Sequence, residues 1–189
     1  PSYTIHSKVI KEDSFKEIQK LFIEAMTNDK MNNSDNTRET FKKNIEYYII
    51  NEYEENTLKA IDELYKYNPD RNIKNENDPT FIFNTPLASN GKTLIYLACQ
   101  EGKDIILEYF LNKGLLAKIP SKIDGVDETP LECACRWGYS KVVHVLLNKV
   151  NYTKKEIKKC LKMKGLSNAV ISLLKEKLDE IKEESCHCG

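Results

Sequence analysis

The stretch Asp127-Glu-Thr-Pro-Leu-Glu-Cys-Ala-Cys-Arg-Trp-Gly138 decides the fold of this chain, because a near copy of it stands 36 residues earlier. The earlier copy reads Gly91-Lys-Thr-Leu-Ile-Tyr-Leu-Ala-Cys-Gln-Glu-Gly102. Each copy is a short apolar stretch that ends at a glycine, and a second apolar helix follows it. A single pair of such helices cannot bury its apolar side, so repeated pairs stack into an elongated solenoid. The sequence therefore predicts an all-α stack of antiparallel helix pairs.

Helical periodicity extends to both sides of the two copies. A capping box at Ser14 and Glu17 opens the first predicted helix. In the second, Phe41, Ile45 and Ile49 share one apolar face together with Tyr48. The predicted helices span about 15–27, 37–54, 57–67, 94–101, 104–113, 130–137, 140–149, 154–163 and 167–184.

Residues 69–92 separate the third predicted helix from the first clear copy, and they hold several prolines and no helical period. A connection of this length is long for a compact domain, so we interpret it as an insertion that is either functional or a loose loop. Within it, Thr80-Phe-Ile-Phe83 is expected to form a short extended piece anchored by its aromatic rings.

The repeated run resembles the ankyrin repeat, a unit of roughly 33 residues made of a tip and two short antiparallel helices. Thr129-Pro130-Leu131 matches the start of its T-P-L-H-x-A pattern, and Gly138 stands at its turn between the helices. The earlier copy matches at Thr93, Ala98 and Gly102. Weaker copies at 47–68 and around Gly165 extend the likeness.

This resemblance implies about four repeats in a solenoid domain over 38–184. In front of it stand an additional helix and linker at 1–37, and a Cys-containing tail at 185–189 follows it.

The copies depart from the family pattern at its histidine, which is replaced by Tyr96 and Glu132. The hydrogen bonds between Thr and His that link neighbouring repeats in the family therefore cannot be carried over. The copies are also spaced three residues wider than the usual repeat, which places surplus residues in the tip around 117–125.

In ankyrin-like proteins, partners bind the concave face, which is formed by the tips and the outward side of each first helix. Trp and Arg are the side chains most enriched in binding hot spots. Trp137, the only Trp of the chain, and Arg136 are therefore the leading predicted contacts, although a lone Trp also serves as partly buried support. Carried over position by position, the resemblance places on this face Asn90, Lys92, Gln100, Glu101, Val126, Glu128, Arg136 and Trp137.

Two further segments carry chemistry that the repeat does not require. The run from Thr153 to Lys164 holds six lysines, which could contact an acidic partner, RNA or anionic lipid, or could form a solvated helix face. The tail Cys186-His187-Cys188 offers metal ligands or acylation sites, but it lacks a second ligand pair. The remaining cysteines are expected as small buried side chains in a reducing compartment: Cys99, Cys133, Cys135 and Cys160.

Composition and missing motifs argue against several classes of function. The chain has 29 basic and 29 acidic side chains, a balance that disfavours nucleic-acid binding. It shows no membrane-spanning stretch and no secretory signal, so we expect a cytoplasmic protein. Without a phosphate-binding loop or a catalytic motif, neither an enzyme nor a cofactor is expected.

The prediction for function is a non-enzymatic protein–protein interaction module, an adaptor or subunit. The alternative is a structural subunit of a large assembly that uses residues 69–92 and both termini as extended contacts.

Overall fold

The computed structural model describes residues 35–51, 58–62, 65 and 75–186 of the chain. The predicted helix at 15–27 lies outside these residues, and the described residues of the third predicted helix are helical. The remaining helices follow the predicted order and confirm the all-α prediction. They are α2 (Asp35–Asn51), α4 (Leu94–Gln100), α5 (Asp104–Asn112), α6 (Pro130–Trp137), α7 (Ser140–Lys149), α8 (Lys154–Leu161) and α9 (Asn168–Cys186).

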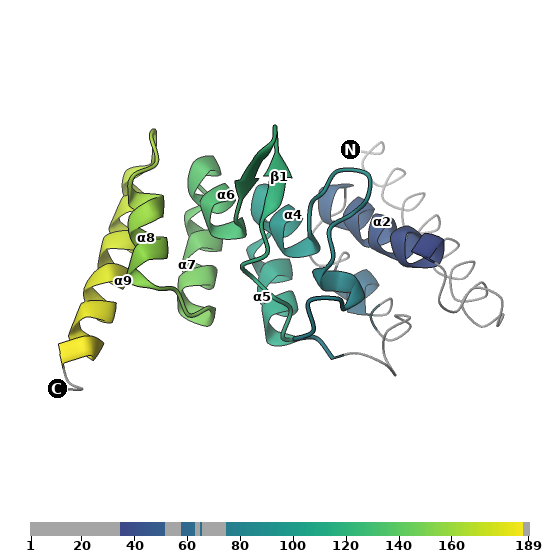
Figure 1. Cartoon of the computed structure of the whole chain (residues 1–189), viewed down its shortest axis with the longest axis horizontal. Helices are drawn as coiled ribbons and strands as arrows, with labels where there is room; N and C mark the ends of the chain where they lie inside the picture. Colours follow the sequence, from purple (N-terminus) through teal and green to yellow (C-terminus); the bar gives the residue numbers. More distant parts are fainter. Residues whose placement is uncertain (1–34, 52–57, 63–64, 66–74, 187–189) are drawn as a thin grey trace, which may run out of the picture.

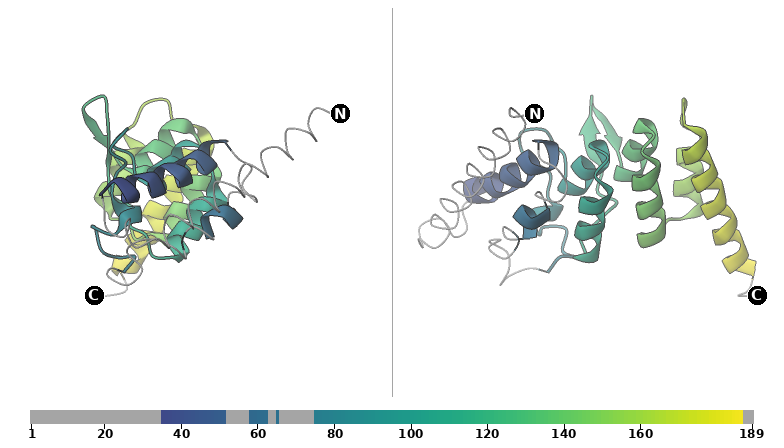
Figure 2. Two further views of the ribbon diagram at one scale, coloured as in Figure 1. Left: turned by 90° about the vertical axis from the view of Figure 1, so that its right-hand side faces the viewer. Right: turned by 180° about the vertical axis from the view of Figure 1, so that it is seen from behind.

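The helices stack side by side in chain order, from α2 at one end to α9 at the other (Figure 1). Three pairs, α4 with α5, α6 with α7 and α8 with α9, form the body of the stack. The first helix of each pair packs against the first helix of the next, and the second helices pack against one another in the same way. Figure 2 shows the same succession from behind. The fold is thus a two-layer solenoid.

Each first helix begins at a threonine that caps it. The hydroxyls of Thr93, Thr129 and Thr153 each accept a hydrogen bond from the backbone N–H three residues further on. Such a cap satisfies a donor that a helix start leaves unpaired, and it stabilises the helix by about 1 kcal/mol. The repeated threonine therefore marks a helix start in all three pairs.

Glycines after the first helices turn the chain into the second helices. Gly138 ends α6 with φ of 72°, a left-handed conformation that favours glycine. Gly102 has φ of 67°, and a Cβ there would lie 3.2 Å from the ring of Tyr139 in the next repeat. Gly102 therefore also makes room for a contact between repeats.

A continuous apolar core runs through the stack. The predicted face of α2 is buried, because Phe41, Ile45, Tyr48 and Ile49 are at most 3 % exposed. In α4 every residue from Leu94 to Cys99 is buried, since α2, α5 and α6 surround this helix. Burying each large aliphatic side chain stabilises the fold by about 1.5–3 kcal/mol. The neighbouring helices thus bury the apolar side chains that a single helix pair would leave exposed.

The described part of the predicted insertion, residues 75–92, contributes to this core. Phe81, Ile82 and Phe83 are buried, which confirms an ordered aromatic anchor. The predicted extended conformation is wrong, because the backbone forms a short 3-10 helix, η1 (Ile82–Asn84), that packs against α2 and α4.

A buried asparagine holds this turn in place. The side-chain nitrogen of Asn84 donates to the carbonyls of Glu76 and Asp78 at 2.8 and 2.9 Å. Its side-chain oxygen accepts from the backbone N–H of Leu116 at 2.9 Å. One side chain thereby satisfies three backbone groups from two separate segments, which joins residues 75–92 to the linker after α5.

The buried ammonium of Lys42 joins the same segment to α2. Its Nζ donates to the hydroxyl of Thr85 and to the carbonyl of Pro86, both at 3.0 Å, and pairs with Glu39. A buried charge is costly unless it is paired and hydrogen-bonded, so these contacts specify one position for the segment.

A β-hairpin interrupts the helical pattern between α5 and α6. Strands β1 (Ser121–Ile123) and β2 (Val126–Glu128) pair antiparallel. Asp124 and Gly125 form the turn with φ of 49° and 80°, the conformation that a two-residue Asp-Gly hairpin turn requires. The surplus residues predicted around 117–125 therefore contribute to an ordered tip.

Asn84→Leu is expected to lower the free energy of unfolding by about 3 kcal/mol, because the buried side chain loses three hydrogen bonds to half-buried backbone groups. Urea unfolding followed by circular dichroism measures the change. Ser89→Ala, at an exposed position of the same loop, is the control and should remain within about 0.5 kcal/mol. A loss below about 1 kcal/mol for Asn84→Leu would show that the turn does not depend on this side chain.

Candidate functional site

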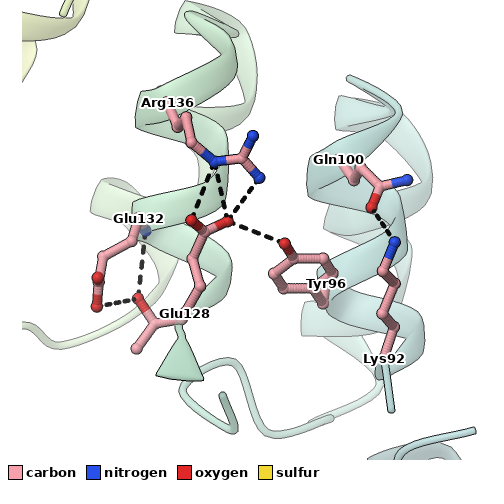
Figure 3. Close-up of polar contacts among 7 residues, drawn as sticks. Lys92, Tyr96, Gln100, Glu128, Glu132 and Arg136 are labelled. Carbon is pink, nitrogen blue, oxygen red and sulfur yellow. Dashed lines mark hydrogen bonds and ion pairs between the residues drawn. The ribbon is translucent and has the colours of Figure 1, made fainter. Parts of the chain in front are cut away.

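The carboxylate of Glu128 links two neighbouring repeats at the base of the hairpin (Figure 3). The hydroxyl of Tyr96, on α4, donates to Glu128 Oε1 at 2.9 Å. Arg136, on α6, donates from Nε to Oε2 at 3.0 Å and from Nη2 to Oε1 at 2.9 Å. A guanidinium that binds a carboxylate through two nitrogens has a favourable and specific geometry. The three side chains therefore tie α4 to α6.

These contacts determine which groups carry protons. Burial by itself would raise the pKa of the Glu128 carboxyl, but hydrogen bonds from Arg136 and Tyr96 outweigh it and hold the pKa below its usual value. The hydrogen bond to Glu128 raises the pKa of Arg136 further above its high ordinary value. Burial, followed by hydrogen bonds with Cys133 and Glu128, raises the pKa of Tyr96. At neutral pH the ion pair is therefore charged and the phenol keeps the proton that it donates.

Glu132 makes the corresponding link from α6 to α8. Its Oε1 accepts from the hydroxyl of Thr129 at 3.1 Å and from Lys159 Nζ at 3.2 Å. Tyr96 and Glu132 occupy the two positions at which the repeat pattern has histidine. Both still connect neighbouring repeats, one as a phenol that donates to a carboxylate and the other as a carboxylate that accepts from a lysine.

The sequence left open whether Trp137 is a contact or a partly buried support, and in the structure it stands at the end of α6 and is 51 % exposed. Its ring stacks on the ring of Tyr139, with centroids 6.5 Å apart and planes inclined by 15°. The guanidinium carbon of Arg136 lies 5.1 Å from the centroid of the Trp137 ring. Tyr139 is in turn packed against Gly102 of the preceding repeat. The indole is therefore open to solvent and held in position by its neighbours.

A second polar group lies on and before α4. Lys92 Nζ donates to Gln100 Oε1 at 2.7 Å, and Gln100 Nε2 donates to Glu101 Oε1 at 3.1 Å. Lys92 Nζ also lies 5.9 Å from the centroid of the Tyr96 ring. Tyr96 thus stands between the polar group on α4 and the ion pair on α6, as Figure 3 shows.

The exposed side of α4, α6 and α8, together with the hairpin, is called the first-helix face below. Seven of the eight predicted residues belong to it. Val126 projects from the hairpin with 69 % of its surface exposed. Asn90 stands at the edge of this face toward α2, because its side chain donates to Glu46 on α2 at 2.7 Å and accepts from the backbone N–H of Lys92 at 2.9 Å. The seven residues are Lys92, Gln100, Glu101, Val126, Glu128, Arg136 and Trp137.

Two features of this face were not predicted: the bridging role of Tyr96 and the hairpin. The dipeptide Asp124-Gly125 between two short alternating segments was a signal for the hairpin. No local signal identifies the partner of Tyr96, because Glu128 lies in the next repeat.

The four cysteines of the helices are free and buried, as predicted. Burial raises the pKa of the Cys133 thiol to about 11, so it is protonated and unreactive at neutral pH. Among the described residues, no cluster of His, Cys, Asp or Glu is arranged to hold a metal ion. The predicted tail site at 186–188 lies outside the part of the chain whose side chains are described.

A family model described as ankyrin repeats, in three copies, matches residues 48–157, which is more than half of the chain. The chain belongs to the ankyrin repeat family. The match begins within α2 and ends within α8, so it includes the region of the weaker copy predicted at 47–68. Searches among curated proteins and among solved structures find no match. No helix in the described ranges is both long and apolar enough to cross a membrane.

Glu128→Gln is expected to lower the free energy of unfolding at neutral pH by about 1 kcal/mol. The loss is modest because solvent partly screens the pair between Glu128 and Arg136. The folded-state pKa of Glu128 lies below its ordinary value, so its stabilisation is present above the unfolded-state pKa and is lost as pH falls through the folded-state pKa. The difference between the wild type and the variant should therefore shrink below about pH 4.

Urea unfolding at a series of pH values measures this difference. Glu108→Gln removes a carboxylate from a pair with Lys149 at the surface and serves as the control, with an expected change of no more than about 0.5 kcal/mol. A difference for Glu128→Gln that stays constant down to acidic pH would contradict the role given to the ionised carboxylate.

Proposed function

We propose that this chain is a non-enzymatic adaptor or subunit that docks a protein partner on its first-helix face. Ankyrin repeats are protein–protein interaction modules. The observation that carries the proposal is the exposed indole of Trp137, which the core does not use and which Arg136 and Tyr139 hold in place. Trp is among the side chains most enriched in binding hot spots, so an exposed indole held in position supports an interaction site.

The arrangement reduces the entropy cost of binding. Arg136 is held by Glu128, and the Trp137 ring is stacked on Tyr139, so few rotamers remain to be lost when a partner docks. Preorganised Trp and Arg side chains are typical of binding hot spots. Val126, on the hairpin, adds exposed apolar surface near the edge of the face.

Polar groups around this apolar centre give the face the composition of an interface rim. Gln100 and Glu101 offer hydrogen-bonding groups on α4, and Lys92 adds a positive charge. An apolar centre with a polar rim is the usual anatomy of a protein–protein interface. In the family this face corresponds to the concave surface, which supports the same assignment.

The alternative, a structural subunit that uses residues 69–92 as an extended contact, is less well supported. Residues 81–84 and Leu87 within this segment are buried in the solenoid itself. A segment that completes its own core has little apolar surface left for a neighbour. Membership of a larger assembly remains part of the proposal, with the first-helix face as the point of contact.

The proposed site of action is the cytoplasm. The four described cysteines in the helices are free thiols, and such thiols persist in a reducing compartment.

Trp137→Ala is expected to weaken partner capture roughly thirtyfold, which corresponds to about 2 kcal/mol, because the variant removes the apolar centre of the face. Affinity capture from native extract, with quantitative mass spectrometry, measures the effect. Ile105→Ala is a matched control, because Ile105 is 48 % exposed on the second-layer helix α5. Equal capture by both variants at wild-type stability would overturn the proposal.

A further inference from the structure

Helix α8 adds positive charge to the first-helix face. Lys155, Lys158, Lys162 and Lys164 are exposed along α8 and the turn that follows it. The buried side of the helix is held by Ile157 and Cys160. The four lysines are called the α8 lysine cluster below. The sequence alone left open whether they form a contact surface or a solvated helix face.

The charges beside this cluster are already paired. Arg136 binds Glu128 at 2.9 Å, Lys159 binds Glu132 at 3.2 Å, and Lys118 binds Glu156 at 3.0 Å. Within residues 75–181, where side chains are described, no carboxylate is paired with a member of the α8 lysine cluster. The cluster is therefore a source of positive charge that no described carboxylate compensates, beside ion pairs that compensate one another.

The end of the cluster at Lys164 lies close to the apolar centre of the face. Helix α8 packs beside α6, and the ion pair between Glu132 and Lys159 joins the two helices. At the other end of α6, a Cβ on Gly138 would lie 3.9 Å from the hydroxyl of Ser167. Gly138 follows Trp137 directly, and Ser167 stands three residues after Lys164. A segment that contacts the indole can therefore also reach the lysines.

We propose that the partner docks on this face through an acidic peptide segment. One apolar side chain of the segment lies against Trp137, and its carboxylates contact the α8 lysine cluster. This inference rests on the proposed function and names the chemistry of the partner. The attraction is a complementarity of charge, which contributes specificity and a faster association rate.

The rest of the face favours an acidic peptide over a nucleic acid. Glu101, Glu128 and Glu132 lie on the same face as Trp137. A nucleic acid carries a phosphate at every nucleotide and would pass these carboxylates, whereas a peptide can restrict its charges to the end that meets α8. The chain has a formal net charge of zero, so its overall charge does not attract a polyanion such as a nucleic acid.

The test is a selection of short random peptides on the full chain, which can be carried out before any natural partner is identified. The expected result is enrichment of Asp and Glu next to a Leu or Phe. Affinities of enriched peptides without Trp are then measured through the fluorescence of Trp137, since it is the only Trp of the chain. Binding should weaken as salt is added.

The decisive variant is the double substitution Lys155→Glu with Lys162→Glu. It should lower the affinity of the chain for the enriched peptides roughly tenfold or more. The control is Lys141→Glu with Lys175→Glu, which makes the same change of charge at exposed positions of the second-layer helices α7 and α9. Lys162 stands at the C-terminus of α8, where Glu is unfavourable for the helix. The variant Lys155→Gln with Lys162→Gln is therefore measured as well, and it should show a smaller loss of peptide affinity.

Enrichment of neutral or basic peptides, or an equal loss in the control, would overturn the inference. The inference would also be overturned if RNA or phosphatidylserine vesicles bound through the α8 lysine cluster while no acidic peptide was enriched. If Trp137→Ala weakens native capture and the double variant does not, the proposed function stands and the acidic partner is wrong. If neither changes capture, both proposals fail.

Discussion

The structure depends on one constraint, which is that the helix pairs can bury their apolar sides only against the neighbouring pairs. Helix α6 meets this requirement with small side chains at its centre, and Cys133, Ala134 and Cys135 are all buried between α4, α7 and α8. The hydrophobic gain of about 25 cal/mol per Å² is realised only when the neighbouring helices are in place. The same constraint leaves few open positions on α6, and Arg136 and Trp137 are exposed there because no neighbouring helix covers them.

Polar contacts between repeats then fix how the buried helices are aligned. The histidine of the family pattern is missing, and the phenol of Tyr96 and the carboxylate of Glu132 join the repeats in its place. The link through Glu128 also orients Arg136, which lies against the ring of Trp137. Stability and the proposed binding surface therefore share one set of contacts, so the carboxylate of Glu128 influences both.

The charges of the first-helix face divide it into two parts. Lys92 before α4 and Arg136 on α6 each have a hydrogen-bonding or ionic partner within the chain, whereas α8 presents lysines without a carboxylate partner among the described residues. The proposed partner would therefore bind in one direction, because only one of its ends would meet the uncompensated charge. The apolar centre at Trp137 and the lysines of α8 would thus determine affinity and orientation separately.

The sequence by itself determined the features that depend on local period and spacing. The repeated threonine and glycine predicted the helix pairs, and the apolar face of α2 was predicted residue by residue. Only the tertiary structure decided which distant groups meet. Tyr96 lies 32 residues from Glu128, and Asn84 lies 32 residues from Leu116. Such pairs carry no periodic signal, because their geometry exists only after the helices have stacked.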